Sequence, residues 1–88
     1  MKQILLKRDR RQEDGNVKLW WWSSNGKLMV SVLDLPQGVI MRISTPDDYR
    51  QVGFPAAYGE NVTQHISEYR QIAVNNLEDM GHDVRLVG

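Results

Sequence analysis

The chain has 88 residues, of which 41% are hydrophobic, with 11 basic and 11 acidic side chains and no cysteine. This length leaves room for one compact domain, and the apolar fraction is too high for an intrinsically disordered segment. The absence of cysteine excludes a disulfide framework and a thiolate metal site. The longest apolar run, residues 19–22, is far shorter than the roughly 20 residues that span a bilayer. Because the N-terminal apolar stretch is also too short for a secretory signal, we expect a soluble, cytoplasmic protein with no membrane contact.

Charge is balanced over the whole chain but is unevenly placed. Residues 1–12 hold five Lys or Arg against one Asp, a net charge of +4, and the other 76 residues therefore carry −4. Residues 1–16 are expected to form a basic N-terminal strand and loop. The arm can contact phosphates or an acidic protein, and the alternative is a solvated loop that keeps the chain soluble.

The clearest local pattern lies within residues 17–44, which are expected to form antiparallel strands. Two apolar runs flank Asn25-Gly26, a dipeptide that suits a two-residue type I′ turn. Such a turn fixes the register and predicts the pairs Ser23–Leu28, Trp22–Met29, Trp21–Val30, Trp20–Ser31, Leu19–Val32 and Lys18–Leu33.

This register predicts two unlike faces. Leu19, Trp21, Leu28, Val30 and Val32 form an unbroken apolar surface that suits a core. The other face carries Lys18, Trp20, Trp22, Met29, Ser31 and Leu33. With two indoles, that second face is too apolar for an ordinary solvated sheet face.

The second half of the chain predicts helices and a last strand. Residues 45–60 are expected to form a short helix, begun by Thr45-Pro46-Asp47-Asp48, and an apolar loop. Residues 61–80 carry apolar side chains at helical spacing, with Asn61 as the N-cap and Gly81 as the stop. A C-terminal strand is expected within 82–88. The fold class is α+β: two layers, with a mainly antiparallel sheet of about four to five strands and one long amphipathic helix on one face.

The sequence offers little catalytic chemistry. His65 and His82 suit the edge of the core and the end of a helix, and no convergent group accompanies either. We therefore expect no catalytic residue, no metal and no cofactor, and a protein that is not an enzyme.

Three alternatives exist for covering the outward tryptophans. Residues 45–60 could fold over them, since exposed apolar patches of this size are unusual in monomers. A second protein, either another copy of this chain or a target, could cover them. Single-stranded nucleic acid could stack on the indoles while Arg8, Arg10 and Arg11 contact phosphates.

Two segments within residues 17–80 resemble a known family. Residues 30–38 (VSVLDLPQG) are similar to the strand and Asp-Leu-Pro-Gly type turn of HicB-type antitoxin domains, with Gln37 interrupting the turn. Residues 44–48 (STPDD) stand where that family begins its helix. The resemblance implies a partial RNase H-like sheet-plus-helix module that masks a small toxin by protein contact.

These observations predict a small binding domain that occupies the surface of a protein partner, as an inhibitor, an antitoxin-like protein or a phage-type host-targeting protein would. The expected contact residues are Trp20, Trp22, Met29 and Leu33, with Arg8, Arg10 and Arg11 steering the encounter. The alternative is a protein that binds single-stranded nucleic acid through the same indoles and the basic arm.

Overall fold

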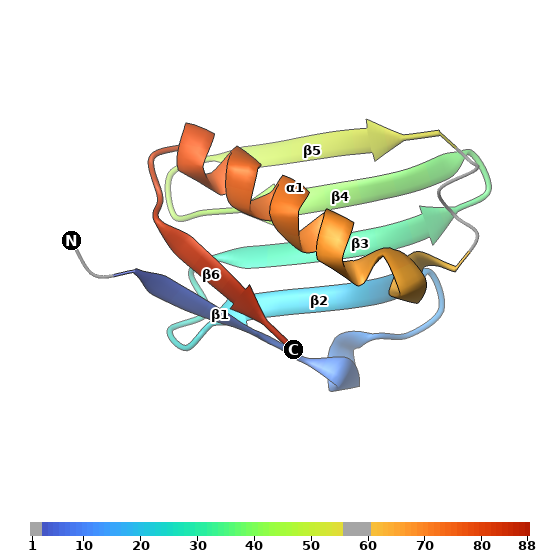
Figure 1. Ribbon diagram of the computed structural model, residues 1–88, viewed down its shortest axis with the longest axis horizontal. Coiled ribbons are helices and arrows are strands. Elements are labelled where there is room, and N and C mark those ends of the chain that lie inside the picture. Colours follow the sequence, from blue (N-terminus) through green and yellow to red (C-terminus); the bar gives the residue numbers. More distant parts are fainter. Residues whose placement is uncertain (1–2, 56–60) are drawn as a thin grey trace.

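A computed structural model describes residues 3–55 and 61–88 and shows one six-stranded sheet with a helix packed on one face (Figure 1). The strand order is β5-β4-β3-β2-β1-β6. The strands are β1 (Ile4–Arg8), β2 (Val17–Ser23), β3 (Met29–Leu35), β4 (Gly38–Ser44), β5 (Tyr49–Phe54) and β6 (Val84–Val87). The helices are α1 (Ile66–Asp79) and two short 3₁₀ turns, η1 (Arg10–Gln12) and η3 (Val62–His65).

The α+β class and the helix-on-sheet arrangement are confirmed, but the sheet is larger and less uniform than predicted. β1 to β5 form an antiparallel meander in chain order, and α1 then carries the chain across the sheet. As a result β6 pairs with β1 in the parallel direction, Ile4 opposite Val84. The sheet therefore has six strands with one parallel pair, where four to five mainly antiparallel strands were expected.

The additional strand is β5, and it replaces the short helix predicted at the start of residues 45–60. Thr45 and Asp48 close a tight turn between β4 and β5: the Thr45 amide donates to the Asp48 carbonyl at 2.9 Å, and the Asp48 amide donates to Thr45 Oγ1 at 3.0 Å. A threonine hydroxyl that accepts from a nearby amide serves a turn as well as a helix N-terminus. The local signal was therefore ambiguous, and the helix prediction was wrong. Of the apolar loop predicted at residues 53–59, Gly53 and Phe54 belong instead to β5, and residues 56–59 lie outside the described residues.

The predicted pairing of β2 with β3 is largely confirmed. Trp22 lies opposite Met29, and Trp21 opposite Val30. The register shifts between Val17 and Leu19, so Val17 rather than Lys18 pairs with Leu33. This irregularity removes Lys18 from the predicted row and leaves the tryptophan positions unchanged.

The turn that joins these strands differs from the predicted type I′. That turn needs positive φ at both central residues, whereas φ is +72° at Gly26 and Asn61 is the only non-glycine with positive φ among residues 3–55 and 61–88. The Gly26 amide donates to the Ser23 carbonyl at 2.9 Å, and the Asn25 side chain accepts from the Lys27 amide at 3.0 Å. The loop is longer than predicted, yet Ser23 and Leu28 still face each other, with Ser23 N donating to Leu28 O at 2.9 Å.

The long helix begins later than predicted. Asn61 has a left-handed backbone (φ 60°) and makes no side-chain capping bond. The short turn η3 follows it, and α1 begins only at Ile66. At the other end Gly81 has φ +93° and the His82 amide donates to the Leu77 carbonyl at 2.9 Å. This is the expected left-handed termination of a helix.

The apolar stripe of the helix packs on the sheet as predicted. Its fully buried members are Tyr69, Ala73 and Leu77, which join the core formed by Leu6, Leu19, Trp21, Val30, Val32, Val39, Met41 and Ile43. A polar contact ties the sheet edge to the helix: Arg50 of β5 donates to Asp79 at 2.8 Å and to Asn76 at 3.2 Å. Asn76 thereby finds a partner inside an otherwise apolar stripe.

Leu77→Ala should lower the free energy of unfolding by roughly 2–5 kcal/mol, because it opens a cavity between α1 and the sheet. Chemical denaturation followed by circular dichroism measures this change. Ser67→Ala, at an exposed position of the same helix, is the matched control and should change stability by less than about 0.5 kcal/mol. Equal effects of the two substitutions would contradict the packing described.

Candidate functional site

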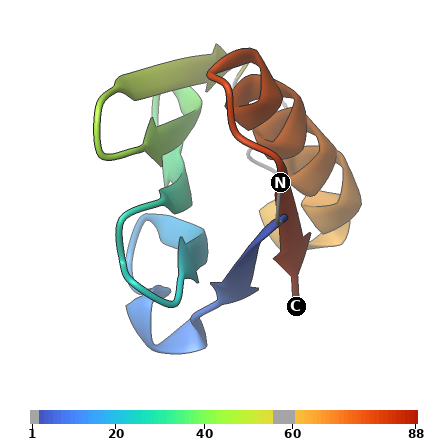
Figure 2. The same cartoon turned by 90° about the vertical axis from the view of Figure 1, so that its left-hand side faces the viewer.

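The sheet face opposite α1 is the candidate site, and we call it the tryptophan face. Cross-strand pairing arranges it in two rows over five strands. The first row is Tyr49, Ser44, Met29, Trp22 and Lys7, and the second is Gln51, Arg42, Ser31 and Trp20; Leu33 follows Ser31 on the same side of β3. Figure 2 shows α1 on one side of the sheet, and only the short turn η1, which contacts β2, borders the other face among the described helices.

The two indoles of this face pack against each other. The ring centroids of Trp20 and Trp22 are 5.7 Å apart with planes at 69°, an edge-to-face arrangement that aromatic pairs favour. Both side chains are half-buried, whereas Trp21 between them is fully buried in the core. The strand pleat thus separates three consecutive tryptophans as predicted.

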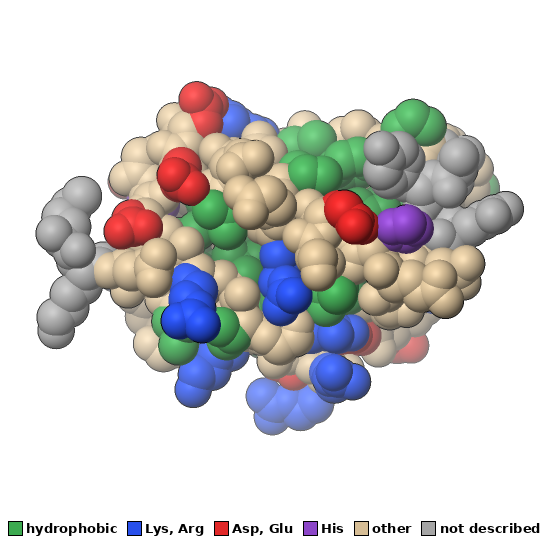
Figure 3. Space-filling model, in the orientation of Figure 1, with side chains coloured by type: hydrophobic (Ala, Val, Ile, Leu, Met, Phe, Trp, Pro, Cys, Tyr) green, Lys and Arg blue, Asp and Glu red, His purple; other side chains and the backbone are tan. Residues whose placement is uncertain are grey.

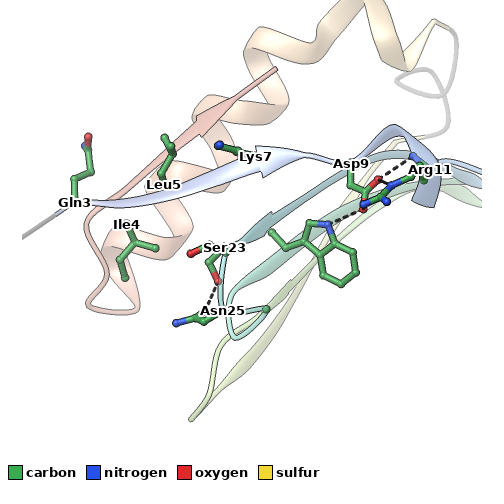
Figure 4. Close-up of a pocket in the computed structure, with 11 residues that line it drawn as sticks. Gln3, Ile4, Leu5, Lys7, Asp9, Arg11, Ser23 and Asn25 are labelled. Atoms are coloured by element: carbon green, nitrogen blue, oxygen red, sulfur yellow. Dashed lines mark hydrogen bonds and ion pairs between the residues drawn. The ribbon is translucent and has the colours of Figure 1, made fainter.

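Asp9, which follows β1, fixes one of these indoles. Its carboxylate is 7% exposed and accepts from Trp22 Nε1 at 3.0 Å. The same carboxylate accepts from Arg11 through the backbone amide at 2.9 Å, Nε at 3.1 Å and Nη2 at 3.3 Å (Figure 4). Asp9 therefore joins η1 to the tryptophan face. Trp20 has no such anchor, because its Nε1 is buried without a hydrogen-bond partner among residues 3–55 and 61–88.

The hydrogen bonds to Asp9 change its titration. The donating Arg11 side chain holds the pKa of Asp9 below its usual range; burial opposes this shift, and the bonds from the Arg11 amide and Trp22 add to it. In return, Asp9 raises the pKa of Arg11. The charged form of the pair is therefore the one that the fold stabilises.

The predicted contact residues divide into two groups. Trp20, Trp22 and Met29 are half-buried on the tryptophan face, and Leu33 joins them but is only 9% exposed. Leu33 therefore offers little accessible area to a partner.

The three predicted arginines also differ. Arg8 lies opposite Trp21, on the helix side of the sheet, and its Nη2 is 2.7 Å from Glu13 in a pair that is largely buried. It serves the fold and is not free to steer a partner. Arg10 and Arg11 are exposed in η1, and the Arg11 side chain is 89% accessible.

The sequence prediction missed three polar members of the site. Lys7 lies opposite Trp22, Arg42 lies opposite Ser31, and Asp9 binds Trp22. Strand alternation could have placed Lys7 beside Leu5, away from Leu6. No local signal in the sequence links Asp9 to an indole 13 residues later.

The two histidines lie away from the tryptophan network. His65 Nδ1 is 2.9 Å from Glu68 Oε2 in an exposed pair on the helix side. Figure 3 shows a His side chain next to an acidic one on this face of the molecule. Within residues 3–55 and 61–88, no three His, Cys, Asp or Glu side chains gather as metal ligands would.

Comparisons with family models, with curated proteins and with solved structures found no match to this chain. The HicB-type resemblance therefore stays a prediction. In the part of the chain that the structure describes, no helix has both the length and the apolar character needed to cross a membrane.

Asp9→Asn should flatten the loss of stability in acid. The pKa of Asp9 is lowered in the folded state, so its stabilising contribution is present above about pH 4, the unfolded value, and is lost as the pH falls through the folded value. Urea unfolding at a series of pH values from neutral to below 4 measures the slope. The same substitution at exposed Asp14 is the control, and an unchanged slope in the Asp9 variant would contradict the assigned network.

Proposed function

We propose that this chain is a non-enzymatic domain that binds a protein partner on its tryptophan face. The observation that carries the proposal is the pair of half-buried indoles, Trp20 and Trp22, on a sheet face that α1 does not cover. Of residues 45–60, which could have folded over them, 49–54 instead form a strand of the same sheet. The described part of that segment therefore cannot shield the indoles.

The composition of the face supports a protein contact. Protein interfaces are enriched in Trp, Tyr, Met and Arg and depleted in acids. Trp22, Met29, Tyr49 and Arg42 lie on this face, and none of its described strand residues is acidic. The Asp9 carboxylate at its border is already saturated by Arg11 and Trp22.

We infer that the protein acts by covering part of its partner's surface. An inhibitor, an antitoxin-like protein or a phage-type host-targeting protein in the cytoplasm would need no catalytic group. Each would need only a rigid binding surface. A second copy of this chain is the alternative protein partner, because the same face can pair with itself around a two-fold axis.

A second candidate is single-stranded nucleic acid. It is favoured by two cations on the same face: Lys7, opposite Trp22 on β1, and Arg42, on β4 in the row of Trp20. Bases stack on such indoles while cations contact phosphates. The overall charge of zero argues against it, since phosphate contacts dominate the affinity of nucleic-acid binders.

Replacing both indoles should weaken partner capture while the fold persists. The immobilised chain is used to capture partners from nuclease-treated extract, and the affinity of an identified partner is then measured with purified components. Trp20→Ala/Trp22→Ala should weaken binding at least about tenfold, as loss of interface hot spots does. Ser67→Ala/Gln71→Ala, at exposed positions of α1, should bind like the wild type.

Two results would contradict the proposal. If the double alanine variant unfolds, the indoles belong to a second core. Met29→Lys then tests the face without removing an indole. Unchanged partner binding by this variant would reject the protein site. Alternatively, the bound material could be nucleic acid whose affinity falls steeply with salt, which would favour the second candidate.

A further inference from the structure

The tryptophan face ends in an open hollow between β1 and the β2–β3 turn. The hollow has a volume of about 820 Å³, within the range of ligand sites. Its walls include Leu5, Lys7, Arg11, Trp22 and Asn25. Figure 4 shows Gln3, Leu5 and Lys7 following one another along and just before β1, with Ser23 at the end of β2 and Asn25 on the turn that follows.

The hollow exists because β1 extends past the end of β2. Pairing between these strands begins with Leu6 opposite Ser23, and the chain of β2 then turns away. Ile4 and Leu5 still pair with β6 on their other side. One flank of β1 therefore faces the hollow rather than a neighbouring strand, and an extended segment of another chain can lie along it.

Two side-chain acceptors of the hollow, the Asp9 carboxylate and the Asn25 amide oxygen, already have donors. Both Asp9 oxygens accept from Arg11, and Oδ2 also accepts from Trp22. Asn25 Oδ1 accepts from the Lys27 amide at 3.0 Å and from Ser23 Oγ at 2.7 Å. The backbone amide at Lys27 requires an oxygen at that position, so it also fixes which way the Asn25 amide points.

The donors, in contrast, are available. A guanidinium has five N–H groups, and Asp9 engages Nε and Nη2 of Arg11. Within residues 3–55 and 61–88, Arg11 Nη1, the Lys7 ammonium and Asn25 Nδ2 have no hydrogen-bond acceptor. Asp9 holds Arg11 by one edge, so the other edge is held in place to receive a second anion.

From this surplus of donors beside an indole we infer that the hollow binds a carboxylate-bearing, extended segment of the protein partner. The inference rests on the proposed function and adds the chemistry of the partner. The acidic side chain contacts Arg11 and Lys7, and its neighbouring apolar groups pack on Trp22 and Leu5. A peptide carboxylate fits better than a nucleic-acid strand, because only a few cations gather here and Asp9 offsets one of them.

The test uses the intact protein and hexaglutamate as the probe. Titration followed by ¹H–¹⁵N NMR should shift the Trp22 indole, the Arg11 Nε and the Asn25 side-chain signals. Lys7→Gln and Arg11→Lys should each weaken the probe affinity roughly three- to tenfold. Lysine keeps a charge beside Asp9 but lacks the second planar edge, so Arg11→Lys tests that edge rather than the charge.

Arg70→Gln is the matched control, because Arg70 is a cation of α1, on the other side of the sheet from the tryptophan face. It should leave the probe affinity unchanged. The inference is overturned if hexaglutamate does not bind, if all three variants weaken binding equally, or if neither Lys7→Gln nor Arg11→Lys weakens it. Tighter binding of an oligothymidylate of equal charge at the same signals would also overturn it.

These outcomes are separable from those of the proposed function. Loss of partner capture in Trp20→Ala/Trp22→Ala without hexaglutamate binding would retain the protein-binding face and reject the acidic segment. Hexaglutamate binding in the hollow without any effect of the two indoles on partner capture would do the reverse.

Discussion

The pleat of β2 sends neighbouring side chains to opposite sides of the sheet and so sets both the core and the tryptophan face. Trp21 is fully buried beneath α1, so Trp20 and Trp22 must lie on the other side. A shift of one residue would bury two indoles in a core built for one and expose the third. The apolar surface outside the core therefore follows from the same packing that stabilises the domain.

Side-chain interactions hold the tryptophans of that surface in fixed orientations. Trp22 is held by Asp9 and by edge-to-face contact with Trp20, and Asp9 is held by Arg11. Side chains that are already fixed lose less conformational entropy on binding, so a pre-ordered face gains affinity from the same buried area. The single saturated carboxylate also leaves the outer edge of Arg11 for another molecule. Stability and recognition thus share one small network.

The sequence predicted those parts of the fold that depend on local periodicity. Strand alternation around Asn25-Gly26 placed the tryptophans, and helical spacing placed Tyr69, Ala73 and Leu77 on the sheet. Prediction failed where one local bond serves two structures: Thr45 closes a turn before β5 with the hydroxyl that could have capped a helix. It also failed at contacts between distant residues. No periodic pattern in the sequence predicts the pairing of Arg8 with Glu13 or the bond from Trp22 to Asp9. Together these contacts decide which cations remain free.

The opposite placement of the indoles can be measured directly by hydroxyl-radical footprinting of the folded protein, with oxidation at each tryptophan assigned by tandem mass spectrometry. We expect oxidation at the half-buried Trp20 and Trp22 and strong protection of Trp21, with the protection lost on unfolding. Oxidation of Trp21 at a rate equal to that of its neighbours, or protection of all three residues, would contradict it.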